Sequence, residues 1–148
     1  MPKFIQGQYS PKNIEKYKGN INKITYRSSW ERAVMVWLDM NPAVLEWSSE
    51  SLSIQYWNPT KNRPANYFPD FYAKIKNKSG LVEKFIMEVK PSKETKPPEF
   101  KPRARAKTKL YESNTWIVNQ EKWRAAIKFC ALHGFKFKLL TEHTLNLG

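Results

Sequence analysis

Residues 30–40 repeat their apolar positions with the period of an α-helix. Apolar side chains at i, i+3, i+4, i+7 and i+8 would form a single stripe: Trp30, Ala33, Val34, Trp37 and Leu38. Ser28 precedes the stripe as an N-cap residue, and Asn41-Pro42 follows it as a stop signal. The pattern predicts an amphipathic helix that packs on a core through these side chains.

Alternation of apolar and polar residues predicts a series of β-strands. Period-two patterns run through residues 52–56, 67–75, 81–90 and 135–139. Turn-forming residues at 58–62 and 76–80 separate the first three patterns, and Pro91 ends the third. We therefore expect three consecutive strands and a fourth near the end of the chain.

Between residues 103 and 134 the pattern changes twice. Residues 103–112 predict a short basic helix, 115–119 a short buried strand, and 121–132 a second amphipathic helix. The apolar face expected for that helix is Trp123, Ala126, Ile127 and Cys130. Gly134 supplies its C-terminal stop.

The predicted order of elements is α-β-β-β-α-β-α-β. Three strands would form an antiparallel meander, and a helical crossover would add a parallel strand. The fold class is therefore α/β (α+β), with a mixed sheet flanked by helices. We divide the chain into a polar, weakly patterned N-terminal arm, residues 1–26, and one domain, residues 27–148.

The chain is strongly basic. Its 26 Lys and Arg residues against 13 Asp and Glu give a net charge of +13. Such a surface attracts phosphate backbones, which favours a nucleic-acid-binding protein over a merely soluble cationic one. The candidates for phosphate contacts follow the third strand: Lys93, Lys96, Lys101, Arg103, Arg105, Lys107 and Lys109.

Composition argues against several other classes. No apolar run reaches the roughly 18 residues of a membrane span, so we expect no membrane contact. The first residues lack the apolar region of a secretion signal. The single Cys130 excludes an internal disulfide and a Cys-rich zinc site. Together these features predict a protein of a reducing cytosol.

Asp70, Glu88 and Lys90 combine into a candidate catalytic site. Glu88 and Lys90 share one face of the third strand because strand side chains alternate. A turn at 76–80 would place Asp70 beside Glu88 on the neighbouring strand. Two carboxylates at such close range repel each other unless a cation lies between them, which predicts a divalent metal ion. Lys90 would orient or deprotonate the attacking water, or stabilise charge in the transition state.

Glu31 has two interpretations. Ser28-x-x-Glu31 matches a capping box, and capping of the first helix would by itself explain the glutamate. The residue also lies one position off the apolar stripe, where its side chain can reach the edge between helix and sheet. The pattern alone leaves both roles open.

These motifs resemble the PD-(D/E)xK nuclease superfamily. Glu31, Pro69-Asp70 and Glu88-Val89-Lys90 match its αβββαβ core in order and in element type. The stretches from Tyr26 to Pro91 also resemble the Tn-seven-transposase endonuclease-like branch. Over nearly the whole chain the sequence is similar to the family of head completion nucleases of T-even-type tailed bacteriophages, in stretches that include residues 11–17, 23–31, 47–50, 93–98, 116–119 and 122–126.

The resemblance implies a metal-dependent DNA endonuclease that processes DNA in packaged phage heads before tail joining. Its catalytic residues would be Glu31, Asp70, Glu88 and Lys90. Mg²⁺, or alternatively Mn²⁺, would be bound by Asp70, Glu88, Val89 through its carbonyl, and Glu31. Partners would be double-stranded DNA and phage head, portal or neck proteins, in the host cytoplasm or in the virion head or neck.

Two alternative functions remain open at this point. The chain could be a structural head or neck protein that uses a nuclease fold only to bind DNA or the portal. It could also be an endonuclease of repair, restriction or transposition. Glu50 matches the phage family as well, with no role assigned.

Overall fold

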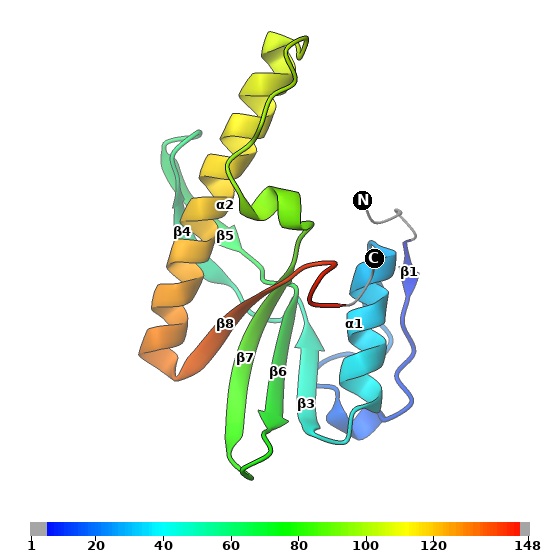
Figure 1. Ribbon diagram of the computed structural model, residues 1–148. Coiled ribbons are helices and arrows are strands. Elements are labelled where there is room, and N and C mark those ends of the chain that lie inside the picture. The colour runs from blue at the N-terminus through cyan, green and yellow to red at the C-terminus, as the bar shows by residue number, and fades with distance from the viewer. Residues whose placement is uncertain (1–5, 146–148) are drawn as a thin grey trace.

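A four-stranded mixed sheet forms the centre of the computed structural model, which describes residues 6–145 (Figure 1). In sheet order the strands are β3 (Val44–Ser49), β6 (Phe71–Lys76), β7 (Val82–Val89) and β8 (Phe135–Leu140). β6 is antiparallel to β3 and to β7, whereas β8 is parallel to β7. The predicted fold class, a mixed sheet flanked by helices, is confirmed.

Helices cover both faces of this sheet. α1 (Ser29–Met40) packs on one face, and α2 (Ala106–His133) packs on the other (Figure 1). The remaining elements are short: β1 (Gly7–Gln8), η1 (Ile14–Lys16), β2 (Thr25–Tyr26), β4 (Ile54–Asn58), β5 (Arg63–Tyr67) and η2 (Ser92–Thr95). β1 pairs with β2, and β4 pairs with β5 as a hairpin inserted between β3 and β6.

Helix α1 begins as predicted and buries Val34 and Leu38 of the predicted stripe, but its buried face is shifted toward Met35 and Asp39. The Ser28 side chain accepts a hydrogen bond from the Glu31 N–H at 3.1 Å, which caps the helix. The buried residues are Val34, Met35, Leu38 and Asp39. The predicted stripe was wrong at Trp37, which is 49% exposed. The helical period of the sequence could not show this, because the side of α1 that carries Asp39 is buried by the chain segment that precedes the helix.

Asp39 is fully buried and holds that N-terminal segment against α1. Its Oδ2 accepts hydrogen bonds from the Tyr9 hydroxyl at 2.6 Å and the Lys12 N–H at 2.8 Å, and its Oδ1 accepts from the Asn13 N–H at 2.9 Å. Burial acts to raise the pKa of Asp39, but these hydrogen bonds outweigh it and lower the pKa below its ordinary value. Tyr9 and Ile24 are buried in the same core cluster as α1. The division into an arm and a domain stays a prediction.

The predicted meander is correct in kind and wrong in its first strand. β3 begins the sheet and was not predicted, because an irregularity between Val44 and Glu46 breaks the period-two pattern. The strand predicted at 52–56 corresponds to β4, which lies outside the main sheet. The strand predicted at 67–75 is divided between β5 and β6, and Asp70 lies in the break.

Helix α2 replaces three predicted elements. The helices predicted at 103–112 and 121–132 belong to one helix of 28 residues, and the strand predicted at 115–119 was wrong. The strand preference of Trp-Ile-Val in that stretch is overridden because α2 packs along the β4–β5 hairpin. Tertiary packing, rather than local preference, therefore sets the length of α2.

The side chains that α2 buries recur at helical spacing: Asn119, Trp123, Ala126 and Cys130. Ile127, placed on this face by the sequence, is 58% exposed and lies off it. Gly134 ends the helix in the left-handed conformation, with a φ of 75°, as predicted. α2 is the crossover that leads to the parallel strand β8, and its N-terminal half extends past the sheet (Figure 1).

Candidate active site

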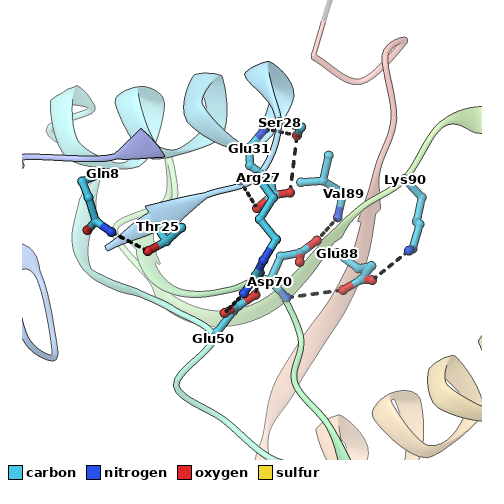
Figure 2. A network of polar contacts seen from close by, with 10 residues as sticks. All are labelled: Gln8, Thr25, Arg27, Ser28, Glu31, Glu50, Asp70, Glu88, Val89 and Lys90. Carbon is cyan, nitrogen blue, oxygen red and sulfur yellow. Dashed lines mark hydrogen bonds and ion pairs between the residues drawn. The ribbon is translucent and has the colours of Figure 1, made fainter. Parts of the chain in front are cut away.

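The start of β6 and the end of β7 bring Asp70 and Glu88 together. The antiparallel pairing of Phe71 with Met87 places Asp70, one residue earlier, opposite Glu88. The Asp70 N–H donates to Glu88 Oε1 at 3.3 Å, and the Val89 N–H donates to Asp70 Oδ2 at 2.8 Å (Figure 2). The hairpin therefore produces the proximity expected from the position of its turn.

Glu88 is 6% exposed and contacts two positive or polar side chains. Its Oε1 accepts a hydrogen bond from the Tyr67 hydroxyl at 2.9 Å, and its Oε2 lies 3.7 Å from Lys90 Nζ. Burial raises the pKa of Glu88, while the charge of Lys90 and the Tyr67 hydroxyl act to lower it. Burial and the charge of Glu88 also raise the pKa of Tyr67, so its hydroxyl stays a hydrogen-bond donor.

The negative charge of Glu88 affects the pKa of Asp70. Burial and then the negative charge of Glu88 raise the pKa of Asp70 well above its ordinary value, against the lowering effect of the Val89 N–H. Bringing a divalent cation between the two carboxylates would remove this repulsion, and carboxylate oxygens are the donors that Mg²⁺ prefers. The pair therefore fits a hard divalent metal ion.

Glu31 lies next to this pair but is turned toward its own helix end. Its Oε2 is 3.4 Å from the Ser28 hydroxyl, and its Oε1 is 3.4 Å from the Arg27 N–H (Figure 2). Burial raises the pKa of Glu31, and the charge of Glu31 contributes to the raised pKa of Asp70. Across residues 6–145, no group of three or more His, Cys, Asp or Glu side chains is arranged to hold a metal ion. In this conformation Glu31 is a capping residue with a carboxylate near the site.

An ion pair that the sequence did not reveal supports the backbone at Asp70. The Arg27 guanidinium contacts both carboxylate oxygens of Glu50, with its second nitrogen at 3.3 Å from Oε2. Glu50 has a φ of 51°, a left-handed conformation that non-glycine residues rarely adopt, and its N–H donates to the Asp70 carbonyl at 3.0 Å. The pair thus fixes the backbone on which the Asp70 carboxylate is mounted.

Lys122 also faces the site, from α2. Its Nζ lies 5.8 Å from the ring centre of Tyr56 and 5.7 Å from that of Tyr67. Burial and then the charge of Lys90 lower the pKa of Lys122, and Glu88 and Asp70 oppose that shift. Nothing in the sequence indicated that Lys122 lies near the carboxylates, because its position depends on the packing of α2 against the β4–β5 hairpin, which was not predicted.

The seven basic residues predicted to contact phosphates are all exposed. They lie on η2, on the segment from 96 to 105, and on the first turn of α2. Since η2 follows Lys90 almost directly, this basic segment begins a few residues after the catalytic-site candidates and continues to the start of α2. Their role in DNA binding stays a prediction.

Known proteins similar to this chain show the family to which it belongs. Residues 41–142 match the family described as TnsA-like endonuclease N terminal. The chain is also 43% identical over 144 residues to the head completion nuclease of Enterobacteria phage T4, an alignment that covers 95% of this chain and 93% of that protein. Both findings confirm the resemblance inferred from the sequence motifs. The chain therefore belongs to the TnsA-like endonuclease family of the PD-(D/E)xK type.

Proposed function

We propose that this protein is a metal-dependent DNA endonuclease whose active site is formed by Asp70, Glu88 and Lys90. The observation that carries the proposal is the carboxylate pair where the start of β6 meets the end of β7. Glu88 is buried there, Asp70 is half-buried, and the Lys90 ammonium lies 3.7 Å from Glu88. Placing a half-buried carboxylate beside a buried one that repels it destabilises a fold, so a cation-binding function is the physical reason to retain the pair. A net charge of +13 matches a polyanionic substrate.

The chemistry can be divided among the residues of the site. Asp70 and Glu88, with the Val89 carbonyl, would hold Mg²⁺ or Mn²⁺, which when bound supplies a Lewis acid and a more acidic water. Lys90 would orient the attacking water and offset the negative charge that develops on the phosphate. Glu31 would accept a hydrogen bond from water at the metal after turning from its cap. Hydrolysis joins the water oxygen to phosphorus and breaks one P–O ester bond, and the proton lost by water balances the one gained by the leaving oxygen.

Incubation with supercoiled plasmid tests the reaction itself. We expect nicked or linear DNA in the presence of Mg²⁺ or Mn²⁺ and intact plasmid in excess chelator, because the carboxylate pair needs a cation to act on phosphate. Gel electrophoresis of the products is the measurement. Equal conversion in chelator would contradict a metal-dependent site, and a folded protein that binds plasmid without cutting it under any condition would favour a binding role.

We further propose that the substrate is DNA in phage heads. The relative from phage T4 is named a head completion nuclease. Its similarity extends over almost the full length of both chains, so a shared place in assembly is the simplest inference. The protein would act in the host cytoplasm on packaged heads before tails join, in contact with head, portal or neck proteins. Among residues 6–145, none of the helices is long and apolar enough to cross a membrane.

The exposed basic segment would hold the DNA through its phosphates, without reading bases. Reversing Arg103, Arg105 and Lys107 to Glu should weaken binding to two unrelated duplexes by the same factor. The slope of log affinity against log salt should become less steep by about 0.9 for each phosphate that the variant no longer neutralises. Fluorescence anisotropy across a salt series measures both quantities. An unchanged slope would place the DNA path elsewhere on the protein.

A further inference from the structure

We infer that Lys122 is a second phosphate-binding lysine of this site, which contacts a DNA phosphate oxygen from the α2 side. The inference rests on the proposed nuclease function and adds a substrate-binding residue to it. Lys90 reaches the carboxylates from the position directly after β7, whereas Lys122 reaches toward them from α2. A phosphate close to the carboxylate pair would then lie between the ammonium groups of Lys90 and Lys122.

The position of the Lys122 ammonium is fixed by two aromatic rings. Its Nζ is nearly equidistant from Tyr56 and Tyr67, at 5.8 and 5.7 Å from the ring centres. Tyr67 in turn donates its hydroxyl to Glu88 at 2.9 Å. Cation–π attraction to both rings restricts the flexible lysine side chain before any substrate arrives. Through its contact with Tyr67, the Lys122 ammonium is therefore held close to Glu88.

The ammonium has no anionic partner within the described chain. Among residues 6–145, Lys122 forms no ion pair with a carboxylate and no hydrogen bond to a carbonyl. Lys16 is a contrasting case, because its Nζ is 2.8 Å from the Asp39 carbonyl and 2.7 Å from the Asn41 carbonyl at the end of α1. A half-buried ammonium without such partners leaves its hydrogen-bond donors available to an anion.

A structural role makes a different prediction. If Lys122 only joined α2 to the β4–β5 hairpin through its tyrosine contacts, its replacement would lower the melting temperature and leave DNA affinity unchanged. Lys122→Met separates the two roles, since methionine keeps a long side chain over the rings and removes the charge. Lys122→Gln is a second neutral variant with a polar tip, and Lys122→Arg keeps the charge.

The experiment measures binding of a short DNA duplex in chelator, so that it does not depend on catalysis. Lys122→Met and Lys122→Gln should each weaken affinity about tenfold at about 0.1 M salt and make the salt slope less steep by about 0.9, the value for one phosphate. Lys122→Arg should bind as wild type does. Lys128→Met is the matched control, because Lys128 is exposed on the same helix and should have a much smaller effect.

Each outcome has a clear meaning. Wild-type affinity in both neutral variants, or an equal loss in Lys128→Met, would overturn the inference. Loss of affinity that tracks a lower melting temperature across the three Lys122 variants would show a structural residue instead. The Lys122 experiment measures metal-free binding, so its result does not depend on the plasmid assay. If the wild-type protein failed to cut plasmid, only the nuclease proposal would be rejected.

Discussion

Glu88→Gln is expected to reduce DNA cutting by about 10²–10⁴-fold while the protein remains folded. The substitution removes the negative charge that would bind metal and holds nearly the same volume. It also preserves an oxygen that can accept the hydrogen bond from the Tyr67 hydroxyl, now 2.9 Å from Glu88 Oε1. Because Glu88 and Asp70 repel each other, the variant should melt at or above the wild-type temperature in chelator. Plasmid cutting and thermal unfolding, measured on the same preparation, check both expectations.

Further variants define what this result means. Asp70→Asn should behave as Glu88→Gln does, and Lys90→Ala should also strongly reduce cutting. Glu83→Gln is the matched control, because Glu83 lies on the same strand outside the site and should leave cutting unchanged. Glu31→Gln keeps most of the capping interaction, so a loss of cutting at unchanged stability would assign Glu31 a catalytic role. Full activity in a folded Glu88→Gln protein would falsify the site assignment.

Asp39→Ala is expected to destabilise the fold more than any other single change considered. The substitution leaves the Tyr9 hydroxyl and the backbone N–H groups of Lys12 and Asn13 without the carboxylate that accepts their hydrogen bonds. Breaking such a buried network costs about 3–5 kcal/mol in the free energy of unfolding. For a chain of 148 residues this corresponds to a fall of about 10 °C or more in melting temperature. Glu15→Gln, at an exposed acid on the neighbouring η1, should change the melting temperature little.

The Asp39 contribution should also depend on pH. The folded-state pKa of Asp39 is lowered, so its ionised form stabilises the fold at pH values above the unfolded pKa of about 3.9. That stability is lost as the pH falls through the folded pKa. The gap in unfolding free energy between wild type and Asp39→Ala should therefore be constant near neutral pH and shrink below about pH 4. Chemical unfolding between about pH 3 and pH 7 measures the gap, and a gap that stayed constant at the lowest pH would contradict this account of Asp39.

Local patterns in the sequence carried the information about the carboxylate pair. The turn predicted at 76–80 lies one residue later, at 77–81, and the resulting β6–β7 register places Asp70 beside Glu88. Side-chain alternation along β7 then places Lys90 on the same side as Glu88. Each of these steps depends on residues that are close in the chain. The sequence therefore determined the mixed-sheet fold class and the geometry of the carboxylate pair.

Contacts between distant segments decided the rest. The buried face of α1 depends on how the N-terminal segment binds Asp39, and the length of α2 depends on its packing along the β4–β5 hairpin. The same packing brings Lys122 to Tyr67, and the approach of Arg27 to Glu50 supports the backbone of Asp70. Local periodicity cannot specify such contacts, because their free energy comes from residues far apart in the chain that meet only in the folded protein.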